Sequence, residues 1–216
     1  MDPVDERRLD QLMWRLETWA VFAREPGVTP SVQAALERHC RIDHAAILLF
    51  PSTIDDLRAS LRARGFEIRR TCPSTVVRRR LAERYDLDLP VAIVYAVRAA
   101  GGPALEVFVP EPGPGFARIA ARERERNEET HLALDVLAPD EIVVRGLGRL
   151  LTSVLGFAPD GGGFNPYEDE ARGGRTVLYF SRPTAWPGRV ELACAGHYPH
   201  ILRSHLARTP ELVADG

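Results

Sequence analysis

The sequence predicts an α+β protein made of two βαβββ modules that follow a helical N-terminal extension. Runs of apolar and β-branched residues, typical of strands, alternate with segments of helical periodicity. The order of these segments starts again near the middle of the chain, and a histidine opens the first strand-like run of each half, at His44 and His131. We therefore expect two modules with pseudo-twofold symmetry around a shared cavity.

The composition argues against several classes of protein. The chain has 216 residues, 45% of them hydrophobic, with a formal charge of −2. This balance argues against a nucleic-acid partner, and no apolar run approaches the roughly 20 residues that span a bilayer. The first residues, MDPVDERRLDQ, do not resemble a secretory signal. The three cysteines form no CxxC motif, so we predict a protein of the reducing cytoplasm.

Several catalytic motifs are missing from the sequence. All 28 basic residues are arginine, which excludes Schiff-base and pyridoxal-phosphate lysines and the lysine of a P-loop. GxSxG and HExxH are also missing. GLGRLL, at 146–151, lacks the third glycine of a dinucleotide-binding loop and fits the interior of an amphipathic helix.

Residues 1–41 form the predicted extension. Apolar residues recur at helical spacing over 5–24, and EPGVTPS then interrupts the pattern. Thr29 is a candidate N-cap for a second helix, with Pro30 at its first position. We expect the extension to pack on the main body or on a partner subunit. In the second case the protein would form a homodimer.

The first module is predicted over 42–114. IDHAAILLF at 42–50 has the composition of a strand, and Gly65 ends the helix that follows. In a second helix, at 74–87, four arginines are expected on the solvent side: Arg78, Arg79, Arg80 and Arg84. Two strands complete the module, at 89–98 and 104–111.

A charged connector, predicted as a solvated helix, spans 115–130 and leads into the second module at 131–207, with a tail at 208–216. The second module repeats the order of the first, with a strand from His131 and a helix that ends at Gly156. The remaining expected elements are a loop at 159–174, strands at 176–183 and 188–196, and a short helix at 197–208.

A second polar landmark repeats along with the histidines. Glu106 and Glu191 each lie in the last strand of a half, at nearly equal distances after the histidine. A tyrosine precedes each glutamate in the neighbouring strand, at Tyr95 and Tyr179. Gly-Phe also ends the first helix of both halves. Four landmarks in the same order indicate an internal repeat.

Strand alternation places these residues on a face with room for a ligand. His44 shares its face with Ala46, and Glu191 shares its face with Ala193. A buried carboxylate is costly unless a cation lies beside it. Two imidazoles and two carboxylates suit one divalent ion such as Fe, Zn, Mn, Ni or Co. We therefore predict a metal in the shared cavity, with four ligands: His44, Glu106, His131 and Glu191.

This pattern resembles the vicinal oxygen chelate superfamily, which includes glyoxalase I, methylmalonyl-CoA epimerase, fosfomycin-resistance enzymes and extradiol dioxygenases. DHAAILL with LRARGFEI resembles the opening strand and helix of such a module, and VLYFSRP with GRVELACAG resembles its closing hairpin. The resemblance covers roughly 42–205. The insertion at 73–88 and the PDGGGFNPYED loop depart from compact members, so the substrate does not transfer from any relative.

The resemblance implies a small-molecule substrate or ligand and one of three functions. The first is a glyoxalase- or epimerase-like isomerase or lyase, in which the metal polarises a carbonyl and Glu191 or Glu106 moves the neighbouring proton. The second is an extradiol-type Fe(II) dioxygenase, with His44, His131 and Glu191 as ligands and Tyr179 as a pocket acid or hydrogen-bond donor. The third is a metal-free protein that binds a drug or metabolite. The fourth ligand, Glu106, favours the first, because it reduces the room for oxygen.

Overall fold

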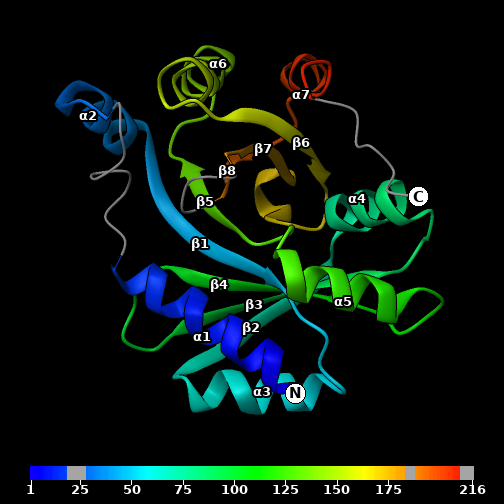
Figure 1. Cartoon of the computed structure of the whole chain (residues 1–216). Helices are drawn as coiled ribbons and strands as arrows, with labels where there is room; N and C mark the ends of the chain where they lie inside the picture. The colour runs from blue at the N-terminus through cyan, green and yellow to red at the C-terminus, as the bar shows by residue number, and fades with distance from the viewer. Residues whose placement is uncertain (19–27, 183–187, 210–216) are drawn as a thin grey trace. The chain divides into compact units, whose positions relative to one another are not determined.

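The computed structural model describes residues 1–18, 28–182 and 188–209. These residues form two compact units. The first unit contains Met1–Thr18 and His44–Thr130, and the second contains 28–43, 131–182 and 188–209. Each unit has its own set of strands and its own helices (Figure 1).

The first unit has a four-stranded sheet in the order β2-β3-β4-β1. β1 is parallel to β4, and the other neighbours are antiparallel. One helix follows β1, and another is inserted between β2 and β3. The elements are β1 (Cys40–Leu48, in this unit from His44), α3 (Ile54–Ala63), β2 (Phe66–Pro73), α4 (Thr75–Tyr85), β3 (Val91–Arg98), β4 (Ala104–Pro110) and α5 (Phe116–Arg126).

The second unit has the same strand order, β6-β7-β8-β5, with β5 parallel to β8 and the other neighbours antiparallel. Its elements are β5 (His131–Val136), α6 (Glu141–Arg149), a π-helical turn η1 (Leu150–Val154), β6 (Ala158–Asn165), a 3-10 turn η2 (Glu170–Arg172), β7 (Arg175–Ser181), β8 (Arg189–Ala195) and α7 (Pro199–Leu206). The predicted α+β class and βαβββ modules are therefore confirmed. The pseudo-twofold relation, the shared cavity and the module boundaries stay predictions.

Local sequence signals set the helix ends. Thr53 and Asp140 cap α3 and α6 by accepting hydrogen bonds from Asp56 N at 3.0 Å and Val143 N at 2.8 Å. Beyond α3 and η1, Gly65 and Gly156 have φ angles of 78° and 71°. This left-handed conformation favours glycine and explains why both first helices stop where the sequence predicts.

The predicted helical extension is divided between the units. α1 (Pro3–Thr18) lies in the first unit, and α2 (Pro30–His39) lies in the second. Thr29 caps α2 as expected, with Val32 N donating to its hydroxyl at 3.3 Å. Residues 19–24 of the predicted first helix lie outside the described residues. α1 packs on the body of its unit, because Arg8 donates to Leu48 O at 3.0 Å and pairs with Glu123 of α5 at 3.2 Å.

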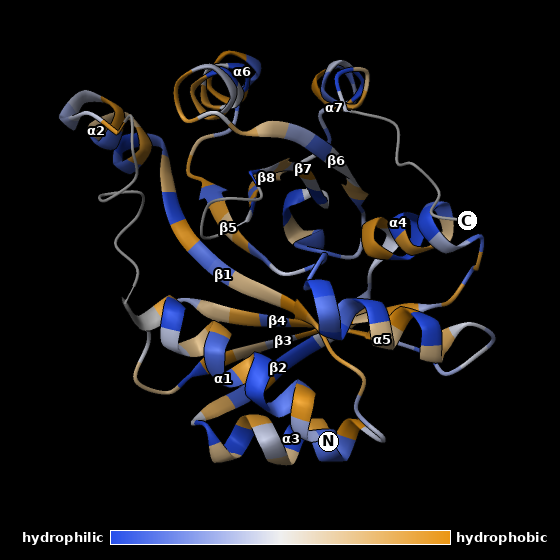
Figure 2. Cartoon of the chain, in the orientation of Figure 1, coloured by the Kyte–Doolittle hydropathy of each residue, from blue (hydrophilic) through white to orange (hydrophobic). Residues whose placement is uncertain are grey.

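The face of the sheet that carries the histidine is packed differently in the two units. In the first unit, α4 and α5 pack against the face that carries His44, since Ala46 and Leu48 share a core cluster with Val77 of α4 and Ile119 of α5. In the second unit, α6 and α7 pack on the face opposite His131, where Leu134 and other strand residues meet them. Most described helices are amphipathic, with hydrophilic and hydrophobic residues on different sides (Figure 2). None of the described helices is long and apolar enough to cross a bilayer.

The predicted loop at 159–174 is wrong in its first half, which forms β6. The glycines and Pro159 obscure the strand signal, and the pairing with β7 shifts register between Pro159 and Gly162. Gly162 is required by close packing rather than by a turn. A Cβ at this position would lie 2.5 Å from Val177 O, which belongs to the neighbouring strand.

Gly162→Ala should therefore destabilise the second unit. Because the new methyl group meets backbone, we expect the free energy of unfolding to fall by about 1–3 kcal/mol, the usual cost of overpacking. Urea denaturation followed by circular dichroism measures this. Gly146→Ala is the matched control, because its Cβ would meet nothing within 4 Å and it lies in α6. This control should be neutral or should stabilise by about 0.5–1 kcal/mol. Equal stability of both variants would contradict the packing argument.

Candidate functional site

A buried histidine–glutamate pair lies on the sheet of the first unit. β1 runs parallel to β4 with Ala46 opposite Glu106, so His44 and Glu106 are diagonal neighbours on one face. His44 Nε2 lies 3.4 Å from Glu106 Oε2, and the side chains are 0% and 3% exposed. The main-chain register of two strands thus places both groups.

The second unit contains the same arrangement. β5 runs parallel to β8 with Ala133 opposite Glu191, so His131 and Glu191 are diagonal neighbours in the equivalent register. His131 Nε2 lies 3.1 Å from Glu191 Oε2, and both side chains are buried. Within each unit, the structure therefore brings together the histidine and the glutamate that the sequence predicts as metal ligands.

A tyrosine stands beside each glutamate. β3 pairs Tyr95 with Glu106, and β7 pairs Tyr179 with Glu191. Tyr179 is buried, and its ring centroid lies 5.0 Å from that of His131 in an edge-to-face contact. Tyr95 is half-buried, with the Arg70 guanidinium 4.9 Å above its ring. The second tyrosine is therefore in ring contact with a predicted ligand.

The residues present fit a divalent cation. Imidazole nitrogen and carboxylate oxygen are the ligand types that Zn, Fe(II), Mn, Co and Ni share. Glu106 Oε1 is buried and accepts no hydrogen bond from any residue that the structure describes. A buried carboxylate oxygen in that state is costly, and a bound cation removes the cost.

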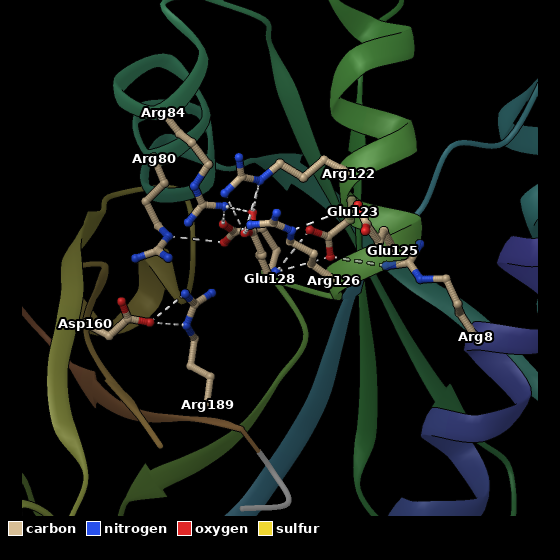
Figure 3. Close-up of polar contacts among 11 residues, drawn as sticks. Arg8, Arg80, Arg84, Arg122, Glu123, Glu125, Arg126, Glu128, Asp160 and Arg189 are labelled. Carbon is tan, nitrogen blue, oxygen red and sulfur yellow. Dashed lines mark hydrogen bonds and ion pairs between the residues drawn. The ribbon is translucent and has the colours of Figure 1, made fainter. Parts of the chain in front are cut away.

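Further charged groups line the His131 face of the second unit, and sequence reasoning missed them. Arg175 donates to Asp43 at 2.8 Å and to Asp135 at 3.1 Å. Arg189 donates to Asp160 at 2.6 Å (Figure 3). Its guanidinium also lies 5.6 Å from the Tyr179 ring. Strand alternation puts Asp135 on the same face as His131, so this acid could have been found from the sequence.

The cysteines do not contribute a nucleophile to this face. Burial raises the pKa of the Cys40 and Cys194 thiols to about 12, so neither is a thiolate near neutral pH. Cys194 belongs to the core on the opposite face, as its position in the strand predicts. Cys72 is partly exposed and lies in β2.

The expectation of solvated arginines on α4 and a solvated connector is wrong in part. Arg80 is 3% exposed, and its Nε lies 3.2 Å from Glu129 Oε2. Arg84 pairs with Glu128 at 2.8 Å and with Glu129 at 3.1 Å. Figure 3 shows Arg84 of α4 and Arg122 of α5 directed toward Glu128. These ion pairs join α4 to the segment after α5 and are largely withdrawn from water.

The same network extends to the N-terminal helix. Glu123 is buried and accepts from Arg8 of α1 at 3.2 Å and from Glu129 N at 3.1 Å. Asp5 of α1 pairs with Arg124 at 2.8 Å. α1, α4 and α5 are thus linked by buried charges within the first unit. In the sequence these charged residues appear as runs of Arg and Glu. Such runs are also typical of a solvent-exposed helix, so the sequence does not reveal that they are buried.

Comparisons with known proteins give structural likeness only. No family model and no curated protein matches the chain. A mutant of 4-hydroxymandelate synthase from Streptomyces coelicolor aligns with a TM-score of 0.45 and 16% identity, over 82% of this chain and 55% of the synthase. The chain therefore spans about half the length of the synthase.

Two methylmalonyl-CoA epimerase structures also align. The Streptomyces coelicolor enzyme gives a TM-score of 0.40 and 17% identity over 74% of this chain and 99% of the epimerase. The Mycobacterium tuberculosis enzyme gives 0.43 and 14% over 74% and 89%. The synthase and the epimerases are members of the vicinal oxygen chelate superfamily, which the sequence resembles. At these TM-scores and identities, the likeness transfers no activity, substrate or ligand residue to this chain.

The buried charge network generates a stability prediction. Glu129→Gln removes the charge that Arg80 and Arg84 contact, so we expect the free energy of unfolding to fall by about 3–5 kcal/mol, as for other broken buried pairs. Replacing both partners, Arg80→Met with Glu129→Leu, should recover much of the loss. Urea denaturation measures each change.

Asp88→Asn is the matched control for this series. Its pair with Arg78 lies on the surface, with both side chains about half exposed or more, so its removal should cost far less. A Glu129→Gln protein as stable as the Asp88→Asn protein would show that the network contributes little.

Proposed function

We propose that the chain is a metal-dependent enzyme of the vicinal oxygen chelate type, in which His44, Glu106, His131 and Glu191 hold one divalent cation. The observation that carries this proposal is the shared register: each unit places a buried histidine diagonally beside a buried glutamate. One pair supplies two ligands, whereas these metals take about four to six. Two His–Glu pairs on one ion supply four protein ligands, and the remaining coordination positions are open to substrate oxygens.

The reaction class that these residues support best is isomerisation or lysis next to a carbonyl. When bound, the metal supplies Lewis-acid polarisation of a substrate oxygen. A carboxylate then accepts the neighbouring proton and returns it. Glu106 is one candidate for this base, because its buried Oε1 makes no hydrogen bond to any described residue. Glu191 is the second candidate, and burial keeps bulk water from both carboxylates.

A specific observation supports a second candidate, the extradiol-type dioxygenase. Tyr179 contacts the His131 ring and stands opposite Glu191, which suits a hydrogen-bond donor to substrate at a site of two histidines and one glutamate. In this case His44, His131 and Glu191 bind Fe(II), and Glu106 is a neighbour of His44 rather than a ligand. The third candidate is a metal-free binding protein. This function gives no reason for burying two His–Glu pairs, so it is supported less well than the other two.

Metal stoichiometry tests the shared ion. We expect purified protein to hold about one divalent ion per chain by elemental analysis, and both His44→Ala and His131→Ala to lower occupancy about ten-fold or more. Two independent sites would instead give about two ions that fall to one in each variant. His200→Ala is the control, because His200 is exposed on α7. Full occupancy in both site variants would remove the assignment, and metal-free wild type would favour the binding protein.

Glu106→Gln separates the two reaction classes. In the isomerase, this isosteric change should slow deuterium exchange next to a carbonyl by about 100-fold or more, because it removes the base. The assay uses solvent deuterium with a panel of α-substituted acyl thioesters and hemithioacetals. In the dioxygenase, Glu106→Gln should keep Fe(II) and oxygen consumption with catechols, whereas Tyr179→Phe should lower kcat. Oxygen consumption that survives Glu106→Gln would overturn the isomerase assignment.

A further inference from the structure

The second unit contains a cavity of about 230 Å³ between α6 and α7. Leu178 and Phe180 of β7 line it, and both alternate with Tyr179 along the strand. The cavity therefore opens on the face of the sheet opposite the Tyr179–His131 contact. It is separate from the proposed metal ligands. Figure 1 shows α6 and α7 over the same face of the β6–β7 hairpin.

The floor of the cavity is apolar. Val144 and Ile201 complete it from α6 and α7, beside Leu178 and Phe180, and all four side chains are buried. Gly148 of α6 also lines the cavity, and a Cβ there would stand 3.6 Å from Phe180 Cζ. A helical glycine costs about 1 kcal/mol relative to alanine. Here its missing side chain leaves the cavity wider.

The rim is positively charged. Arg145 and Arg149 are one turn apart on α6, and Arg208 and Ser204 face the cavity from α7 and the turn after it. All four are exposed. Arg145 has only a surface contact with Glu141 at 3.7 Å. Among residues 1–18, 28–182 and 188–209, no carboxylate lies within ion-pairing distance of the Arg149 or Arg208 guanidinium.

Two further features point to a ligand. Like charges gathered around one cavity repel each other, and a bound anion relieves that repulsion. In addition, α6 changes into the π-helical turn η1 directly after Arg149, and such turns occur frequently at functional sites.

His205 also lines the cavity, and its side chain is uncharged. Its Nε2 lies 2.9 Å from Gly161 O and 3.0 Å from Tyr179 O, so this nitrogen carries the proton that it donates to both carbonyls. Burial lowers the pKa of His205, and the imidazole is neutral at neutral pH. The guanidiniums of the rim are therefore the groups that would meet an anionic ligand.

We propose that this cavity binds a small organic anion, with its carboxylate or phosphate group against Arg149, Arg208 and Ser204 and its apolar part on the floor. Guanidinium forks bind both kinds of oxyanion. The cavity is smaller than the roughly 300–1,000 Å³ typical of drug-sized ligands, so the ligand is a short acyl or single-ring acid. Inorganic phosphate alone would leave the apolar floor unfilled.

Titration of ¹⁵N-labelled full-length protein tests the proposal. The probes are benzoate, phenyl phosphate, inorganic phosphate and the neutral analogue benzyl alcohol. We expect saturable shifts confined to α6, α7 and β7 with one or both organic anions, and much weaker effects with the other two probes. The tighter organic anion identifies the headgroup. An absence of saturable binding, or an equal response to benzyl alcohol, would overturn the proposal.

Variants make this test specific. Arg149→Gln with Arg208→Gln should raise the Kd about ten-fold or more, whereas Arg203→Gln should change it less than about two-fold. Arg203 is a matched control, because it is an exposed arginine of α7 that does not line the cavity. Equal losses in both would indicate nonspecific charge attraction and overturn the site.

His131→Ala separates this proposal from the proposed metal site. It should leave anion binding unchanged, because the cavity lies on the other face of the sheet. Weaker binding in His131→Ala would assign the shifts to the metal site instead and overturn the proposal, whatever the metal content of the wild type.

Discussion

The burial of two carboxylates within apolar sheets is the constraint on which the candidate site depends. Glu106 and Glu191 lie in strands whose neighbours are almost all buried and apolar. An isolated carboxylate in such a place is costly, and the imidazole of His44 or His131 meets only part of that cost. The proposed cation would satisfy this electrostatic demand of both pairs.

The two units meet the same constraint in different surroundings. In the first unit, α4 and α5 cover the face that carries the pair, and buried arginines of α4 pair with Glu128 and Glu129 in the segment after α5. In the second unit, that face holds Arg175 and Arg189 with their acidic partners. The face that carries the pair is thus covered by helices in the first unit, whereas in the second unit it carries ion pairs made by strand residues.

Most of the architecture could be predicted from the sequence because it depends on local pattern. Apolar runs located six of the eight strands closely, alternation assigned the faces of His44 and Glu191, and glycines marked the first helix ends. β2 was missed because Glu67, Arg69 and Arg70 interrupt its apolar pattern. β6 was missed because its glycines and proline are turn residues in most contexts, and only its pairing with β7 makes it a strand. The burial of Arg80 and Glu129 was missed because 49 positions separate the partners. The α6–α7 cavity was also missed, because arginines at helical spacing are equally typical of a helix face exposed to solvent.

The contacts of α1 have a consequence for the order of folding. α1 is synthesised before α5, yet Arg8 donates a hydrogen bond to Asn127, which lies 119 positions later. An isolated helix of this length is marginal in water, and closure over so long a stretch carries an entropic penalty. The nascent first unit therefore has to remain incomplete, with its sheet exposed, until α5 and the turn after it have been synthesised.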